Sequence, residues 1–307
     1  MLLITESDVR RLLPMSECIR LMREAFSRMA SGEAVNQPRR RLSLASGSAL
    51  HYMAASDGKY FGTKIYSTHP VHGAHFLFLL YRAADAELLA LFEANYLGQI
   101  RTGAASGLAT DLMASRDAST AAIIGSGFQA RTQVAAIRAV RNLKTVRVWS
   151  RSPESREAFA AECGAEAADT AEQAVRGAEI VVTATSAKEP VIESAWISAG
   201  THINAMGSNQ AKRRELPADL VERADWLVVD SVEQARKESG DLLLASEEVW
   251  HRVTELRDVV CGQVRIRTNA ADLTIFKSNG IAVEDVISAG YVYERALIEG
   301  AGRPLYS

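Results

Sequence analysis

A short glycine-containing segment near the middle of the 307-residue chain places the strongest constraint on its fold. The segment Gly125-Ser-Gly-Phe-Gln-Ala130 follows the apolar run Ala121-Ala-Ile-Ile124 and opens a stretch with helical periodicity. A G-x-G-x-x-A pattern between a strand and a helix is typical of a dinucleotide site, because the helix N-terminus favours a pyrophosphate. The alternative is a glycine-rich turn in another kind of α/β protein. The predicted contacts of this turn are Gly125, Ser126, Gly127, Phe128, Gln129 and Ala130.

The chain around this turn alternates between strand and helix patterns. From about residue 118, short apolar runs typical of buried strands are separated by helical stretches, as in βαβ units. This predicts an α/β fold, a Rossmann doubly wound parallel sheet with helices on both faces. The predicted strands are Thr120–Gly125, Val146–Trp149, Ile180–Thr185, His202–Ala205 and Trp226–Val229, and the clearest helices are Ala130–Val140 and Glu154–Glu162.

The two ends of the chain follow a different pattern. Residues 1–30 read as helical, with a capping-box-like start from Thr5 to Asp8 and a stop at Gly32. Residues 40–100 read as an antiparallel sheet. Helices are predicted at Gly103–Ala114 and Val283–Leu297. The strands expected in the sheet are 42–44, Ala49–Ala54, Phe61–Ser67, His75–Tyr81 and Leu88–Phe92.

Composition excludes several classes of protein. The 35 Lys and Arg residues against 37 Asp and Glu give no basic surface, which argues against a nucleic-acid binder. No apolar run approaches the length of about 18 residues that a membrane span needs. The N-terminus lacks the basic region and cleavage site of a secretion signal. Cys18, Cys163 and Cys261 are odd in number and far apart, so we expect reduced thiols in a cytoplasmic protein.

The residues after the second predicted strand of the doubly wound sheet bear on cofactor choice. An acid there would bind the ribose of NAD, but Trp149 is followed by Ser150, Arg151 and Ser152. Arg151 can pair with a 2′-phosphate and both serines can donate to it. The sequence therefore favours NADP(H), with NAD(H) as the alternative if Arg151 is only an exposed side chain.

Several cations and histidines precede the dinucleotide turn. Arg39-Arg40-Arg41, Lys64 and Arg101 suggest a carboxylate substrate, unless they are solvated surface charges. His69, His72 and His75 are spaced as H-x-x-H-x-x-H, but Pro70 and Gly73 break a helix there and no further ligand cluster completes a set. We therefore predict no metal site. No G-x-S-x-G or Cys/His pattern indicates a covalent hydrolase.

Eight segments together resemble the ornithine cyclodeaminase/μ-crystallin family over nearly the whole chain. Their order and spacing are specific to that family. They are Gln37-Pro-Arg-Arg-Arg-Leu, Gly62-Thr-Lys-Ile-Tyr-Ser-Thr-His-Pro70, Ile100-Arg-Thr-Gly-Ala-Ala-Ser-Gly-Leu-Ala-Thr110, Ala122-Ile-Ile-Gly-Ser-Gly-Phe-Gln-Ala-Arg131, Ile203-Asn-Ala-Met-Gly207, Arg214-Glu-Leu216, Val228-Val-Asp-Ser231 and Thr274-Ile-Phe-Lys-Ser-Asn-Gly280.

The resemblance implies an architecture and a chemistry. A Rossmann domain, residues 116–281, is inserted into an α+β substrate-binding and dimerisation domain, residues 1–115 plus 282–307, and the protein is a homodimer. Family enzymes are oxidoreductases of amino-acid metabolism that move a hydride between a nicotinamide and the α-carbon of an amino or imino acid. They include ornithine and lysine cyclodeaminases, alanine dehydrogenases and imine reductases.

The resemblance also assigns residues to roles. Arg40, with Arg39 as the alternative, Lys64 and Arg101 look like a carboxylate clamp, and Thr102 looks like a cofactor contact. Gly103 replaces the family's usual Ala. Ser150, Arg151 and Ser152 resemble the corresponding Asn-Arg-Thr of NADPH-using μ-crystallins. The remaining expected cofactor contacts are Ala184, Thr185, Ser186, Met206, Gly207, Ser208, Ser278, Asn279 and Gly280.

Two departures from the family pattern narrow the activity. Asn209 stands where cyclodeaminases carry a catalytic Asp, and an amide cannot exchange protons near neutral pH. His51 replaces their Glu. We therefore expect an NADPH-dependent reductase of a small α-imino acid. A cyclodeaminase and an alanine-type dehydrogenase are the alternatives within the enzyme class. A non-catalytic, crystallin-like protein that binds a small ligand is the alternative from another class. The proton would come from solution, from Lys64 or from His51.

Overall fold

The computed structural model describes residues 1–69 and 71–305 and divides into two compact units. The first comprises Met1–Arg101 together with the chain from Gly280 onward, and the second is Thr102–Asn279. The first border lies inside the helix α3, Asn95–Met113. The domain limits expected from the sequence, 115/116 and 281/282, stay predictions.

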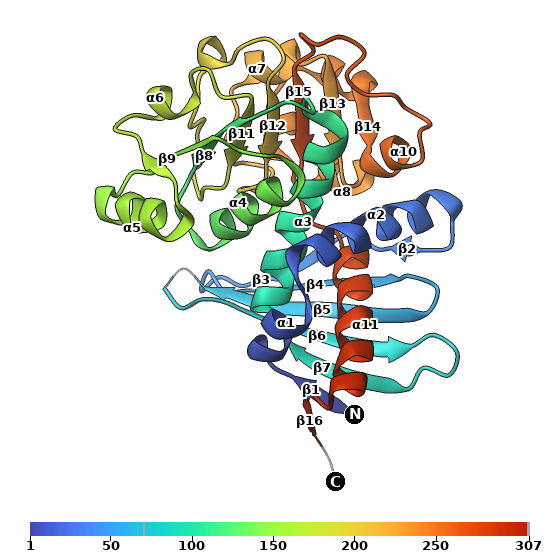
Figure 1. Ribbon diagram of the computed structural model, residues 1–307. Helices are drawn as coiled ribbons and strands as arrows, with labels where there is room; N and C mark the ends of the chain where they lie inside the picture. Colours follow the sequence, from blue (N-terminus) through green and yellow to red (C-terminus); the bar gives the residue numbers. More distant parts are fainter. Residues whose placement is uncertain (70, 306–307) are drawn as a thin grey trace. The chain divides into compact units, whose positions relative to one another are not determined.

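The first unit is built on an eight-stranded, mostly antiparallel sheet with the strand order β16-β1-β7-β6-β5-β4-β2 and with β3 paired to β4 (Figure 1). Its one parallel pair among the described strands is β1 with β7. The strands are β1 Leu2–Ile4, β2 Val35–Asn36, β3 Arg40–Ser43, β4 Ala49–Ser56, β5 Tyr60–His69, β6 Gly73–Arg82, β7 Leu88–Glu93 and β16 Arg303–Pro304.

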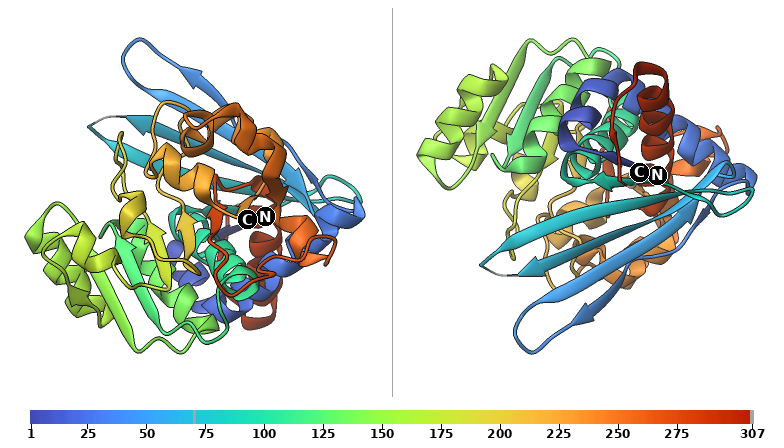
Figure 2. Two further views of the ribbon diagram at one scale, coloured as in Figure 1. Left: turned by 90° about the horizontal axis from the view of Figure 1, so that it is seen from above. Right: turned by 90° about the horizontal axis from the view of Figure 1, so that it is seen from below.

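One face of this sheet is covered by helices. The helix α11, Ala282–Glu299, runs across β4, β5 and β6, with α2, Met15–Ser31, packed against it (Figure 2). Burial alternates along β5, as expected for a sheet with one covered face, and the inward side chains include Lys64 and Tyr66. The predicted capping box is present at α1, Glu6–Leu12, and Gly32 ends α2 in the left-handed conformation, as expected.

Two elements of the first unit differ from the sequence-based prediction. Residues Leu2–Ile4 form a strand rather than a helix, because they pair with both β7 and β16. The helix predicted from Gly103 begins eight residues earlier, at Asn95. Its first amides are satisfied by a distant carboxylate, since Glu6 accepts hydrogen bonds from Asn95 N at 2.7 Å and Tyr96 N at 2.6 Å.

The second unit contains an eight-stranded parallel sheet with the order β10-β9-β8-β11-β12-β15-β13-β14 (Figure 1). The strands are β8 Thr120–Ile124, β9 Thr145–Trp149, β10 Glu166–Ala167, β11 Ile180–Thr183, β12 His202–Ala205, β13 Trp226–Val229, β14 Val253–Glu255 and β15 Thr274–Lys277. The helices are α4 Phe128–Val140, α5 Pro153–Cys163, α6 Ala171–Val175, α7 Ala218–Arg223, α8 Val232–Glu238, α9 Gly240–Leu243 and α10 Leu256–Val260, with the short turns η1 Ser194–Trp196 and η2 Glu247–Arg252.

Two hydrophobic cores lie on opposite faces of this parallel sheet. Successive residues of β8 point to different cores, because Ile123 packs with Val134 and Phe159 whereas Ile124 packs with Val181 and Leu220. The helices α4 and α5 contribute to the first core, and α6 and α7 to the second. The predicted doubly wound Rossmann sheet is therefore confirmed. The predicted α+β character of the first unit, whose two segments precede and follow the second unit in sequence, is confirmed as well.

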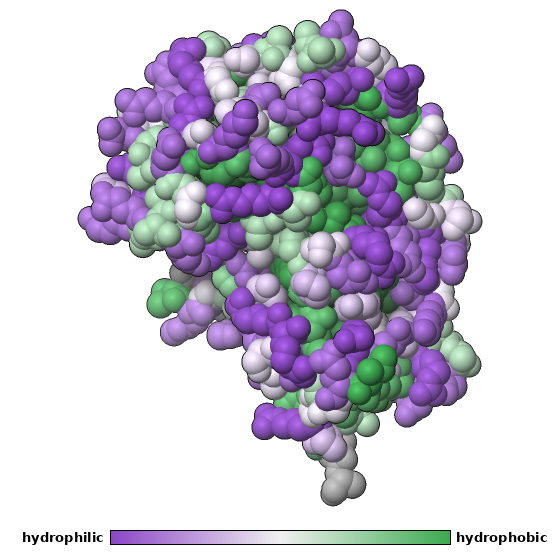
Figure 3. All heavy atoms as spheres, in the orientation of Figure 1, coloured by the Kyte–Doolittle hydropathy of each residue, from purple (hydrophilic) through white to green (hydrophobic). Residues whose placement is uncertain are grey.

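The face of the molecule drawn in Figure 3 is mostly hydrophilic, with a small hydrophobic patch over the last turns of α11, where Leu297 and Ile298 are exposed. Among the described residues, none of the helices is both long enough and apolar enough to cross a membrane.

Candidate active site

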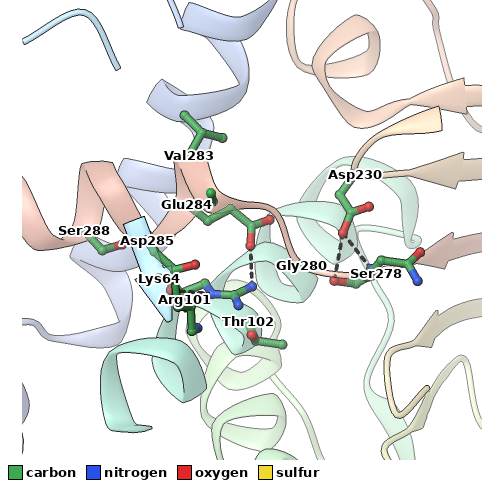
Figure 4. A network of polar contacts seen from close by, with 12 residues as sticks. Lys64, Arg101, Thr102, Asp230, Ser278, Gly280, Val283, Glu284, Asp285 and Ser288 are labelled. Carbon is green, nitrogen blue, oxygen red and sulfur yellow. Dashed lines mark hydrogen bonds and ion pairs between the residues drawn. The ribbon is translucent and has the colours of Figure 1, made fainter. Parts of the chain in front are cut away.

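Four charged side chains meet in the interior of the first unit. The ammonium of Lys64, on β5, lies 2.9 Å from Oδ1 of Asp285, and Nε of Arg101 lies 3.2 Å from the same oxygen. The guanidinium of Arg101 also donates to Glu284, at 2.6 Å. Figure 4 shows the two cations and two carboxylates converging, with the acids in the first turn of α11. We call these four residues the charged cluster.

Two glycines leave room for the cations of this cluster. A Cβ on Gly98 would lie 2.6 Å from the Lys64 nitrogen, and one on Gly280 would lie 2.5 Å from a nitrogen of Arg101. Gly280 also has a φ of +74°, which favours glycine. A side chain at either position would push a cation out of place.

The charges of the cluster shift one another's pKa. Burial lowers the pKa of Lys64 to about 8, although Asp285 raises it, and Arg101 and Arg39 lower it further. Burial opposes the ionisation of Asp285, yet Arg101 and Lys64 hold the pKa of its carboxyl below the ordinary value. The two carboxylates raise the pKa of Arg101 despite its burial.

The register of β3 decides between the arginines of the Arg39–Arg41 run. Arg40 pairs with Tyr52 and therefore lies on the outer face of the sheet, opposite to the face of Lys64. Arg41 pairs with His51 on the inner face. Arg39 donates to the carbonyl of Gly280 at 3.1 Å. The clamp role expected for Arg40 stays a prediction, but the geometry favours the alternative, Arg39, whose charge also lowers the pKa of Lys64.

His51 is buried on the inner face of the sheet and is held neutral. Its Nδ1 accepts from Arg41 at 3.3 Å, its Nε2 lies 2.9 Å from the Thr68 hydroxyl, and its ring stacks on Tyr66. Burial, Arg41 and Arg39 together lower the pKa of His51 to about 4. A pKa this low does not suit His51 to proton donation at neutral pH, and its expected place among the catalytic residues stays a prediction.

The dinucleotide turn of the second unit has the geometry that its sequence predicts. Gly125 has a φ of +113°, and a Cβ there would lie 2.4 Å from the carbonyl oxygen of Ala184. Gly127 caps the N-terminus of α4, and a Cβ on it would meet no atom within 4 Å. Ala130 is fully buried against the sheet. A tight turn with open space before the N-terminus of a helix is the arrangement that accepts a pyrophosphate.

The segment that follows β9 lies beside this turn. The hydroxyl of Ser126 donates to that of Ser150 at 2.9 Å. Arg151 is exposed, and Ser152 caps α5 by accepting from Ser155 N while donating to Glu154 at 2.8 Å. The side chain of Ser152 is therefore used by the helix, which leaves Arg151 as the charged group at this position.

The other expected cofactor residues of the second unit lie in loops at the carboxyl ends of the parallel strands. Ala184, Thr185 and Ser186 follow β11, Met206, Gly207 and Ser208 follow β12, and Ser278 and Asn279 follow β15. Asn209, expected as a catalytic-site residue, comes directly after Ser208. This edge of a doubly wound sheet is the one that binds nucleotides. Thr102 is buried in α3, where the next residue, Gly103, approaches α4 so closely that a Cβ would lie 2.7 Å from the Thr132 carbonyl oxygen.

Comparisons with known proteins place the chain in a family. The model of the ornithine cyclodeaminase/mu-crystallin family matches residues 1–300. The chain belongs to that family. Delta(1)-pyrroline-2-carboxylate reductase from Bacillus cereus is 35% identical over 99% of both chains. The Thermococcus litoralis reductase of the same name, solved with NADH and L-proline, has a TM-score of 0.94 and 34% identity over 99% of this chain and 100% of its own.

A third relative extends the comparison to another enzyme of the family. An archaeal alanine dehydrogenase, solved as a dimer with bound NAD, has a TM-score of 0.93 and 30% identity over 100% of this chain and 99% of its own. The predicted resemblance to the ornithine cyclodeaminase/mu-crystallin family is thus confirmed.

The sequence did not point to Glu284 and Asp285. They lie in a helix whose other buried residues are mainly apolar, and adjacent acids in a first turn are common because they favour the helix dipole. What distinguishes them is full burial, which acids rarely tolerate without partners and which only the structure shows.

The predicted lack of a metal site concerned His69, His72 and His75. The rings of His69 and His72 stack at 4.7 Å. Within residues 1–69 and 71–305, the structure contains no group of three His, Cys, Asp or Glu residues arranged to hold a metal ion.

Proposed function

We propose that this member of the ornithine cyclodeaminase/mu-crystallin family is an NAD(P)H-dependent oxidoreductase that reduces small α-imino acids of the ketimine or pyrroline-2-carboxylate type to L-amino acids. The observation that carries the proposal is the buried charged cluster of Lys64, Arg101, Glu284 and Asp285, in a chain that also contains the dinucleotide turn. The names of the Bacillus cereus and Thermococcus litoralis relatives support the same substrate class.

The charges of the site suit an anionic substrate. Lys64 and Arg101 are balanced by Asp285 and Glu284, so the additional positive charge comes from Arg39 and from Arg41 beside His51. We propose that Lys64, Arg101 and Arg39 bind the substrate carboxylate and thereby orient the imine carbon for hydride transfer. Such orientation supplies much of the rate of a reaction between two bound molecules.

Reduction of a C=N bond needs a hydride and a proton. The bound nicotinamide would supply the hydride to the imine carbon. For the proton on nitrogen we favour Lys64, because a pKa of about 8 leaves it charged at neutral pH yet able to donate. His51, with a pKa of about 4, carries no spare proton at neutral pH, and Asn209 is an amide.

We propose NADP(H) as the preferred cofactor, with NAD(H) as the alternative that the bound ligands of the relatives favour. Arg151 is the group that supports this choice, since an exposed guanidinium can pair bidentately with a 2′-phosphate. Arg151→Ala should weaken NADPH binding by roughly tenfold to hundredfold and leave NADH binding nearly unchanged, as expected for one lost charge-assisted contact. Titrating both cofactors into both proteins measures this, and an unchanged preference would assign Arg151 to the solvated surface.

We further propose a cytoplasmic homodimer. Reduced thiols at Cys18, Cys163 and Cys261 are consistent with the cytoplasm. The outer face of the antiparallel sheet exposes Leu42, Leu50, Tyr52 and Leu77, an apolar surface suited to a second copy of the chain. The dimeric alanine dehydrogenase relative supports this assembly.

The decisive experiment follows NADPH oxidation with pyrroline-2-carboxylate. The unmodified protein should reduce this substrate. Lys64→Ala and Arg101→Ala should each lower kcat/KM by at least about 100-fold, because each removes a buried positive charge and leaves a buried carboxylate without that ion pair. Lys59→Ala, an exposed lysine one residue before β5, is the matched control and should keep its activity. Undiminished turnover of both cluster variants would exclude the cluster from catalysis, and NADPH binding without turnover of any imine would favour a binding protein.

A further inference from the structure

Two loops of the second unit are in direct contact at the carboxyl edge of the parallel sheet. The strands β11 and β12 are neighbours, and the loops that follow them contain Thr185 and Gly207. A Cβ on Gly207 would lie 2.4 Å from both the N and the O atoms of Thr185. The backbones approach so closely that only glycine fits at position 207.

A fully buried carboxylate joins these two loops. Glu215 accepts four hydrogen bonds: from Thr185 N and the Thr185 hydroxyl at 2.7 Å each, from Gly207 N at 2.7 Å and from the Thr183 hydroxyl at 3.0 Å. Four bonds use all the acceptor positions that a carboxylate offers. The side chain therefore fixes the backbone of one loop relative to the other.

A buried ion pair, Asp241 with Lys277, connects Glu215 to the second loop. The backbone N of Glu215 donates to Asp241 at 2.6 Å, and Asp241 pairs with the Lys277 ammonium at 3.0 Å. Lys277 in turn donates to the carbonyl of Ser208 at 2.6 Å. Gly207 is thus bonded to Glu215, and the next residue, Ser208, to Lys277, which is the last residue of β15.

The chemistry of these contacts requires an ionised Glu215. Burial, with Asp241, leaves the pKa of its carboxyl raised overall, although Lys277 and the hydrogen bonds from Thr185 lower it; the donor groups around both oxygens are the geometric reason to assign the ionised form. All four groups that bond to the carboxylate act as donors, two of them from Thr185. An amide in its place would direct N–H groups at the N–H of Thr185 or Gly207, and the two loops would have to separate.

We propose that Glu215 is a positioning residue for the dinucleotide: it sets the spacing of the loops 184–186 and 206–208, which in turn shapes the cofactor site. The inference rests on the proposed function, because it takes those loops as cofactor contacts. Glu215 itself touches no reacting atom. A role in fold stability alone would lower the melting temperature without changing cofactor affinity in the folded protein.

The test compares Glu215→Gln with Glu189→Gln, which makes the same chemical change on an exposed residue after β11. NADPH and NADH are titrated into each protein well below its Tm, and steady-state kinetics separate the two KM values. We expect Glu215→Gln to raise the Kd and KM of the cofactor by at least about tenfold, as loss of charge-assisted contacts implies. The KM of the imino acid should change little, and Glu189→Gln should resemble the unmodified protein.

A milder variant keeps the test decisive if Glu215→Gln fails to fold. Thr183→Val is nearly isosteric and removes one of the four donors, so the Kd of the cofactor should rise by roughly threefold to tenfold. Unchanged cofactor affinity in the folded variants, with or without a lower Tm, overturns the inference alone. If the unmodified protein binds neither cofactor, the proposed function and this inference are overturned together.

Discussion

Lys64 is the residue whose protonation should limit activity at alkaline pH. Its pKa is lowered to about 8 by burial, and both carboxylate binding and proton donation need its charged form. As pH rises through about 8, the ammonium loses its proton, so kcat/KM should fall. His51, already neutral with a pKa of about 4, should add no break in the ordinary histidine range.

This pH dependence can be assigned to Lys64 by comparing the unmodified protein with Lys64→Arg. The guanidinium of arginine stays charged in this range, so the break near pH 8 should disappear even if the overall rate is lower. Because the imine substrate titrates equally in both assays, a break seen in only one protein belongs to the enzyme. A break at the same pH in both proteins would contradict the assignment.

Arg39 and Arg40 are adjacent in sequence, but Arg40 lies on the outer face of the sheet whereas Arg39, just before β3, contacts Met53 and Gly280, so their substitutions should have different effects. Arg39→Ala removes a positive charge near Lys64 and should raise the KM of the imino acid by roughly tenfold to hundredfold. Arg40→Ala should change that KM by less than about threefold, as is common for an exposed side chain. The reverse order of effects would show that the register of β3 does not decide the role.

The difference between these arginines shows what sequence reasoning could reach at the residue scale. Gly125 and Gly127 were predictable because their role depends on a local turn between a strand and a helix. The choice of Arg39 depends on the pairing of β3 with β4, and a shift by one residue exchanges the two faces. Asp285 becomes meaningful only through its contacts with Lys64 and Arg101, which lie far away in the chain.

At the scale of elements, α3 shows how a tertiary contact extends a helix. Its alanine-rich part was predictable, but the first turn, with Asn95 and Gly98, has weak helix propensity. Glu6 satisfies two amides of that turn from a position 89 residues away in sequence. No pattern local to residues 95–102 carries this information.

Removing that cap should therefore destabilise the protein. Glu6→Ala leaves the amides of Asn95 and Tyr96 without their acceptor and should lower the free energy of unfolding by about 1–3 kcal/mol. Urea denaturation followed by circular dichroism measures the change. Glu157→Ala, an exposed helical glutamate in α5, serves as control and should stay within about 0.5 kcal/mol of the unmodified protein. Equal effects of the two substitutions would mean that Glu6 is not a cap.

At the scale of the whole molecule, the alternation of strand and helix patterns was enough to predict the parallel sheet, because each βαβ unit is local in sequence. The first unit was harder to predict. Its sheet is closed at one edge by β1 and β16, the two ends of the chain, and its covering helix α11 follows the whole second unit in sequence. Only the family resemblance joined these distant segments into one unit.

The outer face of that sheet gives the last prediction, which concerns assembly. Leu50 and Leu77 both lie on this face. Leu77 pairs with Ile65, which pairs with Tyr52, and Tyr52 is two residues from Leu50 on the same face of β4. Leu42 pairs with Leu50 and extends the apolar surface. If the face binds a second copy, Leu50→Asp with Leu77→Asp should place four charges in an apolar interface of the dimer and raise its dissociation constant by at least about 100-fold. Sedimentation velocity over a range of concentrations measures this. Leu297→Asp, on the exposed end of α11, is the matched control and should leave the dimer intact. A monomeric unmodified protein, or a double variant that remains dimeric, would show that this apolar face has another purpose.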